Sequence, residues 1–443
     1  MHPQQTSDTR PAPKQRVVIL NDSSVARGGA TGLALLSARL LREQGRDVTF
    51  ISGDGGDGGE LAALGVELIA LGGKLLLEED RLRALRNGIY NTGLRDRVAS
   101  YIASQDTDET VYHLHGWSRI LSPAIFDALT PVATRTFIHA HDFFLACPNG
   151  SYFDFRRKQI CTRQPLSAGC LATNCDKRSY PQKLWRVLRQ GAVRRALDLN
   201  AGWAGILILH EGMSAGLSRA GIPKHLMTTV RNPAHPFSQH RIKAEKNSRF
   251  CFIGRTGTGK GLAALCEAAQ MAGVPLRVIG DDSDQPELRN KYPQVEFTGW
   301  VDQAKIRDYL QDVRALVMPS LFSEPFGLVA AEASLSGLPV VISQTALLAT
   351  EVAEHGLGFA IDPLNLSNFA DVLSQVAELP EEDVHRISER GFSGATSLSQ
   401  TPATWISQLN GLYRGAVRSE TEADQHRNQT EPSLRPQMAD PHL

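Results

Sequence analysis

Short runs of aliphatic and β-branched residues alternate with longer amphipathic stretches along most of the chain. In the first half, these runs are residues 17–20, 48–51, 66–71, 111–114, 136–140 and 205–209. The stretches between them, such as residues 29–44, carry apolar residues at helical spacing. Strands that alternate with helices usually pair in parallel and are covered on both faces, so the pattern predicts an α/β domain over residues 16–235.

A second series of apolar runs occupies residues 249–254, 276–280, 295–297, 315–318 and 339–342. It predicts a second α/β domain over residues 249–395, after a polar, Pro-containing linker at 234–248. A last amphipathic segment, residues 396–417, is expected to form a helix that packs across both domains. Residues 1–15 and 418–443 are polar and lack periodic apolar positions, so we expect disordered tails there.

Composition narrows the classes of function. The 443 residues contain 47 Lys and Arg and 47 Asp and Glu, and this zero net charge argues against general nucleic-acid binding. The longest apolar run, residues 201–209, is far shorter than the ~20 residues of a membrane span. Six cysteines are too few for a disulfide scaffold, and the first sixteen residues lack an apolar signal segment. We therefore expect a cytoplasmic protein.

The strongest local motif, SEPFGLVAAE at residues 323–332, follows the run 315–318. Pro325 suits the first turn of a helix, Gly327 allows a ligand to approach the backbone, and the free N–H groups of a helix start favour an anion. Glu324 precedes this helix and Glu332 lies within it, so the two carboxylates flank the anion-binding helix start. This arrangement suits a nucleotide that carries a sugar at each end, because each sugar would lie beside one carboxylate. The alternative is an ordinary capped helix with solvent-facing glutamates.

A glycine-rich turn, GRTGTGKG at residues 254–261, follows the first run of the second domain. It nearly spells the P-loop of ATPases, but Gly261 stands where a P-loop has its Mg²⁺-binding hydroxyl. Arg255 and Lys260, five residues apart at a predicted helix start, can hold a diphosphate without a metal. A P-loop ATPase and a flexible surface turn are the alternatives.

Two motifs of the first domain are weaker evidence for a ligand site. The glycine turn at residues 28–32, which includes Gly29, indicates only a close approach to the backbone. His141 follows the run 136–140, and a side chain at the carboxyl end of a parallel strand faces the ligand crevice. His139 and His115 are lesser candidates. Close packing of the turn and a satisfied buried histidine are the alternatives.

An insertion at about residues 142–180 carries four of the six cysteines, namely Cys147, Cys161, Cys170 and Cys175. Four thiolates predict a structural Zn²⁺ or an iron–sulfur cluster, with four reduced thiols packed as small apolar groups as the alternative. Residues 177–195 then carry seven basic residues and no acid. This stretch predicts a peripheral membrane contact or a phosphate-bearing acceptor, and a solvated helix face is the alternative.

Together these motifs resemble the family-4 retaining glycosyltransferases (glycosyl transferases group 1), which have the two-domain GT-B fold. The matching segments are RGGATG, HAHDFFLACPNG, TVRNPAH, GRTGTGKG and EPFGLVAAE. The resemblance extends over residues 17–415 and is most specific in the second domain. It implies two Rossmann-like, doubly wound α/β domains that face a central cleft, the first for the acceptor and the second for the nucleotide-sugar donor.

The resemblance also implies roles for single residues. Arg255 and Lys260 would bind the donor diphosphate, together with backbone N–H groups of the helix start. Glu332 would take the ribose hydroxyls and Glu324 the donor sugar, which His141 would touch from the opposite domain. The backbone contacts to the donor would come from Gly29, Phe326, Gly327 and Leu328.

The expected function is therefore retaining transfer of a hexose from a nucleoside-diphosphate sugar to a hydroxyl of a glycan or lipid-linked glycan, in bacterial surface polysaccharide synthesis. We expect no cofactor in catalysis, because the cations and the helix start would neutralise the departing diphosphate. The enzyme would act in the cytoplasm at the inner face of the membrane, with no nucleic-acid partner. The alternatives are a P-loop ATPase, an epimerase or phosphorylase of the same fold, and a non-catalytic sugar-nucleotide-binding protein.

Overall fold

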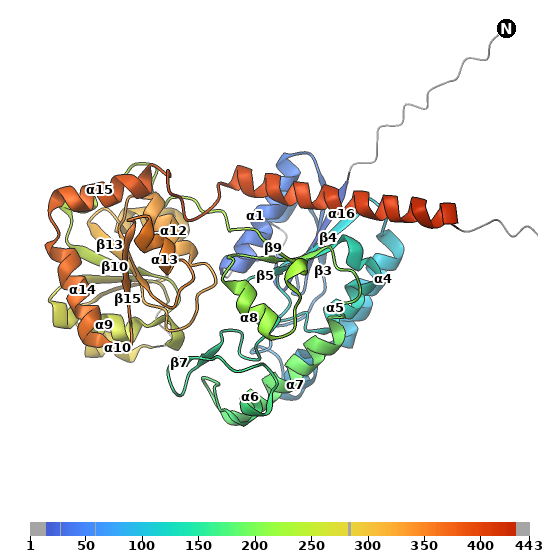
Figure 1. Ribbon diagram of the computed structural model, residues 1–443, viewed down its shortest axis with the longest axis horizontal. Helices are drawn as coiled ribbons and strands as arrows, with labels where there is room; N and C mark the ends of the chain where they lie inside the picture. Colours follow the sequence, from blue (N-terminus) through green and yellow to red (C-terminus); the bar gives the residue numbers. More distant parts are fainter. Residues whose placement is uncertain (1–14, 27, 58, 282–284, 431–443) are drawn as a thin grey trace, which may run out of the picture.

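A computed structural model describes residues 15–430 apart from residues 27, 58 and 282–284 (Figure 1). Two parallel sheets lie side by side, and helices cover both faces of each sheet. This confirms the predicted α/β fold with two doubly wound domains.

The first domain holds a sheet with strand order β3-β2-β1-β4-β5-β8-β9, in which every pair is parallel. Its strands are β1 (Arg16–Asn21), β2 (Asp47–Ser52), β3 (Glu67–Ala70), β4 (Thr110–Leu114), β5 (Thr136–Ala140), β8 (Gly205–Ile208) and β9 (Met227–Thr229). Its helices are α1 (Gly29–Glu43), α2 (Gly59–Ala63), α3 (Arg81–Ile89), α4 (Thr92–Gln105), α5 (Ala124–Leu129), α6 (Ala168–Ala172), α7 (Tyr180–Ala196) and α8 (Met213–Arg219).

The second domain repeats this winding with the order β12-β11-β10-β13-β14-β15, again all parallel. Its strands are β10 (Arg249–Ile253), β11 (Leu276–Ile279), β12 (Glu296–Gly299), β13 (Val313–Met318), β14 (Val340–Ser343) and β15 (Gly358–Ile361). Its helices are α9 (Leu262–Ala272), α10 (Glu287–Lys291), α11 (Gln303–Ile306), α12 (Leu328–Leu335), α13 (Ala349–Glu354), α14 (Leu366–Glu378) and α15 (Glu381–Phe392).

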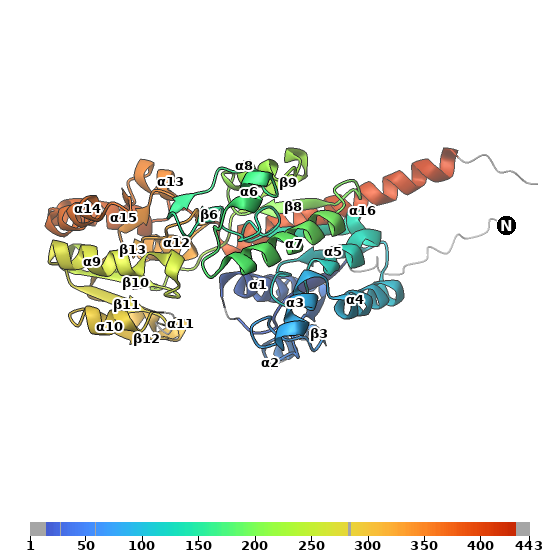
Figure 2. The same cartoon turned by 90° about the horizontal axis from the view of Figure 1, so that it is seen from below.

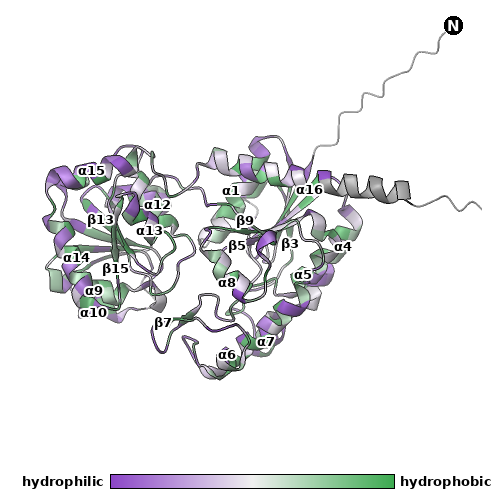
Figure 3. Cartoon of the chain, in the orientation of Figure 1, coloured by the Kyte–Doolittle hydropathy of each residue, from purple (hydrophilic) through white to green (hydrophobic). Residues whose placement is uncertain are grey.

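The apolar runs of the sequence become the strands of both sheets. All eleven predicted runs coincide with a strand, and central strands such as β4, β5 and β13 are buried at every position. Hydropathy colouring shows the hydrophobic strands inside and the polar helix faces outside (Figure 3). Burial on both faces explains why these strands read as continuous apolar runs.

The C-terminal helix α16 (Pro402–Thr430) departs from two predictions. It packs on the first domain, where Trp405, Ile406 and Tyr413 join the buried cluster of Val17 and Phe137. The predicted tail from residue 418 is wrong as far as Thr430, because the sequence from 416 to 430 contains no Gly or Pro to end the helix. Gln15, assigned to the other tail, is buried and donates to the Tyr413 carbonyl (3.1 Å). Residues 1–14 and 431–443 lie outside the described residues.

The insertion after β5 is largely irregular. It contains a short antiparallel hairpin, β6 (Phe153–Asp154) with β7 (Gln159–Ile160), and the single-turn helix α6. It leads into α7, the long helix at the lower edge of the first domain in Figure 1. The hairpin reaches the second domain, because a Cβ placed on Gly259 would lie 3.2 Å from Phe155.

Candidate functional site

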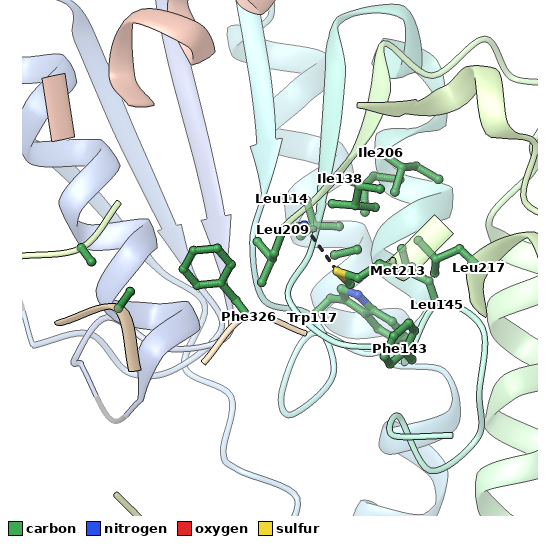
Figure 4. Close-up of a cluster of buried hydrophobic side chains, with 14 of the residues drawn as sticks. Leu114, Trp117, Ile138, Phe143, Leu145, Ile206, Leu209, Met213, Leu217 and Phe326 are labelled. Carbon is green, nitrogen blue, oxygen red and sulfur yellow. Dashed lines mark hydrogen bonds between the residues drawn. The ribbon is translucent and has the colours of Figure 1, made fainter. Parts of the chain in front are cut away.

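The start of α12 is shaped for an anion. Gly327 precedes it with φ 82° and ψ 59°, and a Cβ there would lie 2.7 Å from the Met318 side chain, so only glycine fits. Among the described residues no side chain caps this helix, and since the Ala330 N–H donates to the Gly327 carbonyl, the N–H groups of Leu328 and Val329 stay available. Phe326 anchors the turn: it is 2 % exposed and belongs to the same buried cluster as Leu209 and Trp117 of the first domain (Figure 4).

Lys260 and Glu324 meet beside that helix start. The Lys260 Nζ lies 2.6 Å from the Glu324 Oε2, which also accepts a hydrogen bond from Ser320 Oγ (3.0 Å). The two residues are 64 positions apart in sequence, but they follow β10 and β13, which are neighbouring parallel strands. The carboxyl ends of such strands lie at one edge of the sheet, which explains the contact. Arg255 is exposed on the same glycine-rich turn as Lys260.

The glycine-rich turn does not have the chemistry of a P-loop. Gly261 adopts φ 73°, and a Cβ at this position would collide with the backbone carbonyl of Pro319. A Ser or Thr in place of Gly261 would therefore displace the end of β13. The missing Mg²⁺-binding hydroxyl thus has a steric cause, which disfavours the ATPase alternative.

Glu332 lies one turn into α12 and is half-buried. Burial raises the pKa of its carboxyl to about 8. Within the described part of the chain, no hydrogen bond or ion pair reaches this carboxylate. A ligand that donates hydroxyl groups would supply the missing partners.

The first domain contributes Gly29 and His141 to the same region. A Cβ on Gly29, the first residue of α1, would lie 3.4 Å from Leu328 Cδ1, so the two helix starts touch. His141 follows β5, is half-buried, and shares a hydrogen bond between its Nε2 and His115 Nδ1 (3.1 Å). Burial lowers the pKa of His141 to about 3, so its imidazole is neutral at physiological pH.

Behind His141 lies a group of buried histidines that the sequence analysis ranked low or missed. His113 Nε2 lies 3.2 Å from His139 Nδ1, and His113 Nδ1 lies 2.7 Å from the Tyr413 hydroxyl. The ligand atoms of His113, His115 and His139 all lie within 4.8 Å of one another. The repeats HLH and HAH on paired strands were the available signal, because residues two apart on a strand share a face.

A second missed group joins the two domains. Arg231 follows β9 and binds Glu351 of α13 through two contacts of 2.6 and 2.8 Å. His210 Nε2 lies 2.8 Å from the same carboxylate. No local motif marks these residues, since each acquires its partner only when the domains meet.

Of the four cysteines of the insertion, Cys170 and Cys175 contact Lys183 of α7, and the four are not found at metal-ligand spacing. Cys147, Cys170 and Cys175 are buried and Cys161 is partly exposed. Among the described residues, ligand atoms in groups of three within 4.8 Å occur only at the histidines, so sulfurs under roughly 4 Å apart, as expected for a tetrahedral zinc, are not observed. The Lys183 ammonium instead donates to both Cys170 Sγ (3.4 Å) and Cys175 Sγ (3.3 Å).

The basic stretch 177–195 is only partly a surface. Lys183 and Arg189 are buried, and Arg186 binds the buried Asp176 (2.8 Å). Its exposed face instead carries Leu184 and Leu188 beside Arg194 and Arg195. No helix in the described part of the chain is long and apolar enough to cross a membrane.

Comparison with known proteins finds a family model that matches the part of the chain containing the α12 site. Residues 247–378, which contain Lys260, Glu324 and Glu332, match the family model "Glycosyl transferases group 1". A protein of the cps region of Klebsiella pneumoniae is 27% identical over 184 residues, covering 39% of this chain and 49% of that protein. A D-inositol 3-phosphate glycosyltransferase of Streptomyces scabiei is 36% identical over 129 residues, covering 28% of this chain and 29% of that enzyme. The chain thus spans about half of the first relative's length and less than a third of the second's.

Two solved structures share the fold over nearly the whole chain. Sucrose-phosphate synthase from Thermosynechococcus elongatus has a TM-score of 0.66 at 16% identity, with 92% of this chain and 100% of that one covered. Anabaena HepE in complex with UDP and glucose has a TM-score of 0.62 at 15% identity, with 90% and 100% covered. Residues 247–378 thus match the glycosyl transferases group 1 model, and the chain as a whole shares the two-domain fold of these two solved structures.

Proposed function

We propose that the protein is a retaining glycosyltransferase that moves a hexose from a nucleoside-diphosphate sugar to a hydroxyl group of a glycan or lipid-linked glycan. The observation that carries this proposal is the Lys260–Glu324 pair at the uncapped start of α12, where Gly29 of the first domain touches Leu328. A cation and free backbone N–H groups in one place stabilise the negative charge of a departing diphosphate.

Each side chain has a role in this mechanism. Lys260 and Arg255 bind the diphosphate, and Lys260 exchanges its contact with Glu324 for one with phosphate oxygens. Glu332 accepts hydrogen bonds from the ribose hydroxyls, and the freed Glu324 holds the donor sugar. Neutral His141 offers a hydrogen bond to that sugar from the first domain. The acceptor hydroxyl approaches on the face that the diphosphate leaves, and this gives retention.

The comparisons suggest which substrates to try first. The solved HepE complex contains UDP and glucose, so UDP-glucose is a reasonable first donor for this chain. The cps-region relative and the structurally similar WaaG, "a glycosyltransferase involved in lipopolysaccharide biosynthesis", support a bacterial surface polysaccharide as the product.

A surface of leucines and arginines supports a lipid-linked acceptor. Exposed Leu82 and Leu85 lie on α3 between Arg81, Arg83 and Arg86, and α3 packs against α7, which exposes Leu188. Such a face can insert leucines between anionic head groups and hold these with guanidinium groups. It would bring the first domain to the inner face of the membrane.

Transfer and binding can be measured separately. Thermal shift against a panel of nucleotide sugars identifies the donor, since a ligand at 100 times its Kd adds about 2.7 kcal/mol to the free energy of unfolding. Release of nucleoside diphosphate that depends on an acceptor, with the product anomer determined by NMR, then tests retaining transfer. Transfer should survive EDTA. Binding without turnover would favour the non-catalytic alternative, and inversion at the anomeric carbon would refute retention.

Membrane contact has its own test. Leu82→Asp with Leu188→Asp should weaken sedimentation with phosphatidylglycerol vesicles at least tenfold. Leu364→Asp, at an exposed leucine of the second domain (48 % against 76 % for Leu82 and 64 % for Leu188), serves as the control. Equal binding by both variants would reject the membrane face and leave the donor site untouched.

A further inference from the structure

We propose that the insertion after β5 binds an acceptor that carries phosphate groups, through basic residues at the tip of the β6–β7 hairpin and in the segment beside it. These residues, which we call the basic hairpin surface, are Arg156, Arg157, Lys158, Lys177 and Arg178, and all five are exposed. The inference rests on the proposed transferase function, because it names the chemical class of the acceptor.

The exposed charges of this surface are all positive. Residues 155–180 contain six Lys or Arg and a single acid, Asp176, although the whole chain has zero net charge. Asp176 is buried and binds Arg186 of α7 (2.8 Å), so it does not neutralise the surface. Among the described residues, no carboxylate pairs with the three cations of the tip, residues 156–158. Adjacent cations without counter-charges attract an anion.

Hydrogen bonds hold the hairpin tip in place. The buried Asp154 accepts the backbone N–H groups of Arg156 and Arg157 at its Oδ1 (both 3.1 Å). The Arg156 guanidinium donates to the Arg178 carbonyl (2.7 Å), and this contact brings residues 177–178 beside the tip. A cationic surface that is already ordered loses less conformational entropy when a ligand binds.

The basic hairpin surface lies near the turn that carries Lys260. Figures 1 and 2 both place the hairpin between the two domains. A Cβ on Gly259 would lie 3.2 Å from Phe155, and Lys260 is the next residue. Arg157 and Lys158 are two and three residues beyond Phe155, so their Cα atoms lie within about 7 and 11 Å of the Phe155 Cα. A phosphate bound here would therefore hold the acceptor close to the proposed donor site.

The residue types favour phosphate on the acceptor over a membrane. Three of the five cations are arginines, whose planar guanidinium groups bind phosphate oxygens in pairs. Membrane insertion needs well-exposed apolar side chains. Those of the insertion, Ile160, Leu171 and Tyr180, are each 38 % exposed, against 76 % for Leu82 of α3. The leucine-bearing face of α3 and α7 therefore suits a membrane better, and the hairpin suits a phosphorylated glycan.

Binding of a sugar phosphate tests the surface without turnover. Glucose 6-phosphate and neutral glucose are titrated by ligand-observed NMR, in proteins that all carry Lys260→Ala so that the proposed diphosphate site does not dominate. Glucose 6-phosphate should bind about tenfold tighter than glucose, or more. Arg157→Glu with Lys158→Glu should abolish this preference, and Lys305→Glu with Arg307→Glu, at exposed cations of the second domain, should retain it. Equal affinities in the two double variants, or no preference without them, would overturn the proposal.

Transfer then connects the surface with the acceptor. With Lys260 intact, phosphatase treatment of the acceptor preparation should lower transfer by the wild type about tenfold or more. Arg157→Glu with Lys158→Glu should raise acceptor KM by a similar factor and leave donor KM within about twofold. Unchanged acceptor KM, or loss of phosphatidylglycerol vesicle binding alone, would overturn the phosphate-bearing acceptor and leave the proposed function standing. Charge-dependent binding of glucose 6-phosphate without acceptor-dependent transfer would instead overturn the proposed function and leave the phosphate surface standing.

Discussion

At the scale of the residue, the proposed donor site depends on a few charges beside the uncapped start of α12. Lys260 is the central one, because its ammonium lies 2.6 Å from Glu324 beside the start of α12. Two negative charges of a diphosphate would replace this single carboxylate. In the proposed mechanism, the contact with Glu324 would hold the Lys260 ammonium in position for the diphosphate.

Removing either of the two cations, Lys260 or Arg255, should impair transfer more than folding. We expect Lys260→Ala and Arg255→Ala each to lower turnover by about 10²-fold or more, as for loss of one donor that stabilises developing charge. Acceptor-dependent release of nucleoside diphosphate measures the effect. Lys291→Ala, at an exposed lysine paired with Glu267, is the control. Turnover at the wild-type level in both variants would refute the assignment of the diphosphate site.

The buried Glu332 carboxyl should make the free energy of unfolding depend on pH. Burial raises its pKa in the folded state to about 8, above the unfolded value near 4.5, so the folded protein keeps a proton that the unfolded chain loses. The free energy of unfolding therefore falls as pH rises from about 4.5 to 8. Glu332→Gln should remove this loss, giving a higher Tm than the wild type at pH 8 and nearly the same Tm at pH 5.

The same substitution should weaken nucleotide binding. Contacts with ribose act equally in ground and transition states, so KM for the donor should rise more than kcat falls. Glu324→Ala should instead lower kcat, since it lies beside the proposed sugar position. Exposed Glu354→Gln is the control for both experiments. A Glu332 variant with unchanged Tm profile and unchanged donor KM would restore the reading of α12 as an ordinary helix.

At the scale of the element, α16 is a helix of the first domain that the chain reaches only after completing the second. Trp405 and Tyr413 are fully buried against the first sheet, and the Tyr413 hydroxyl meets His113. The helix thereby closes the face that carries the histidine group. Its amphipathic spacing was visible in the sequence, but the choice of sheet was not.

Truncating Trp405, the buried tryptophan of α16, should destabilise the first domain. We expect Trp405→Ala to cost about 3–5 kcal/mol in the free energy of unfolding, as for other fully buried aromatic side chains. Chemical denaturation followed by circular dichroism measures the loss. Trp300, which is 73% exposed, provides the control, and Trp300→Ala should change the free energy by less than about 0.5 kcal/mol. Equal effects of both substitutions would contradict the packing of α16.

At the scale of the whole molecule, the two domains are joined by polar contacts as well as by Phe326. Arg231 after β9 binds Glu351 of α13, and His210 shares the same carboxylate. These contacts lie beside the proposed donor site, since Gly212 approaches Leu347, whose N–H donates to the Glu324 carbonyl (3.1 Å). They couple the position of one domain to the other.

If Arg231 and Glu351 hold the domains together, exchanging their charges should restore what a single substitution loses. Arg231→Glu should weaken the domain contact and raise donor KM several-fold, and adding Glu351→Arg should restore part of both losses. We expect a coupling energy of about 1–3 kcal/mol, typical of residues in direct contact. Small-angle scattering and donor KM supply the readouts. Additive effects in the double variant would mean that the pair does not hold the domains together.

The sequence by itself determined the fold class, eleven of the thirteen strands of the two sheets and the motifs of the proposed donor site. It did so because strands buried on both faces must be continuous apolar runs, and because glycines at the starts of α9 and α12 satisfy local backbone needs. The tertiary structure alone decided which distant residues meet. Lys260 contacts Glu324 because β10 neighbours β13, and Lys183 of α7 contacts Cys170 and Cys175 of the insertion. Such contacts depend on strand order and helix placement, which periodicity along the chain does not specify.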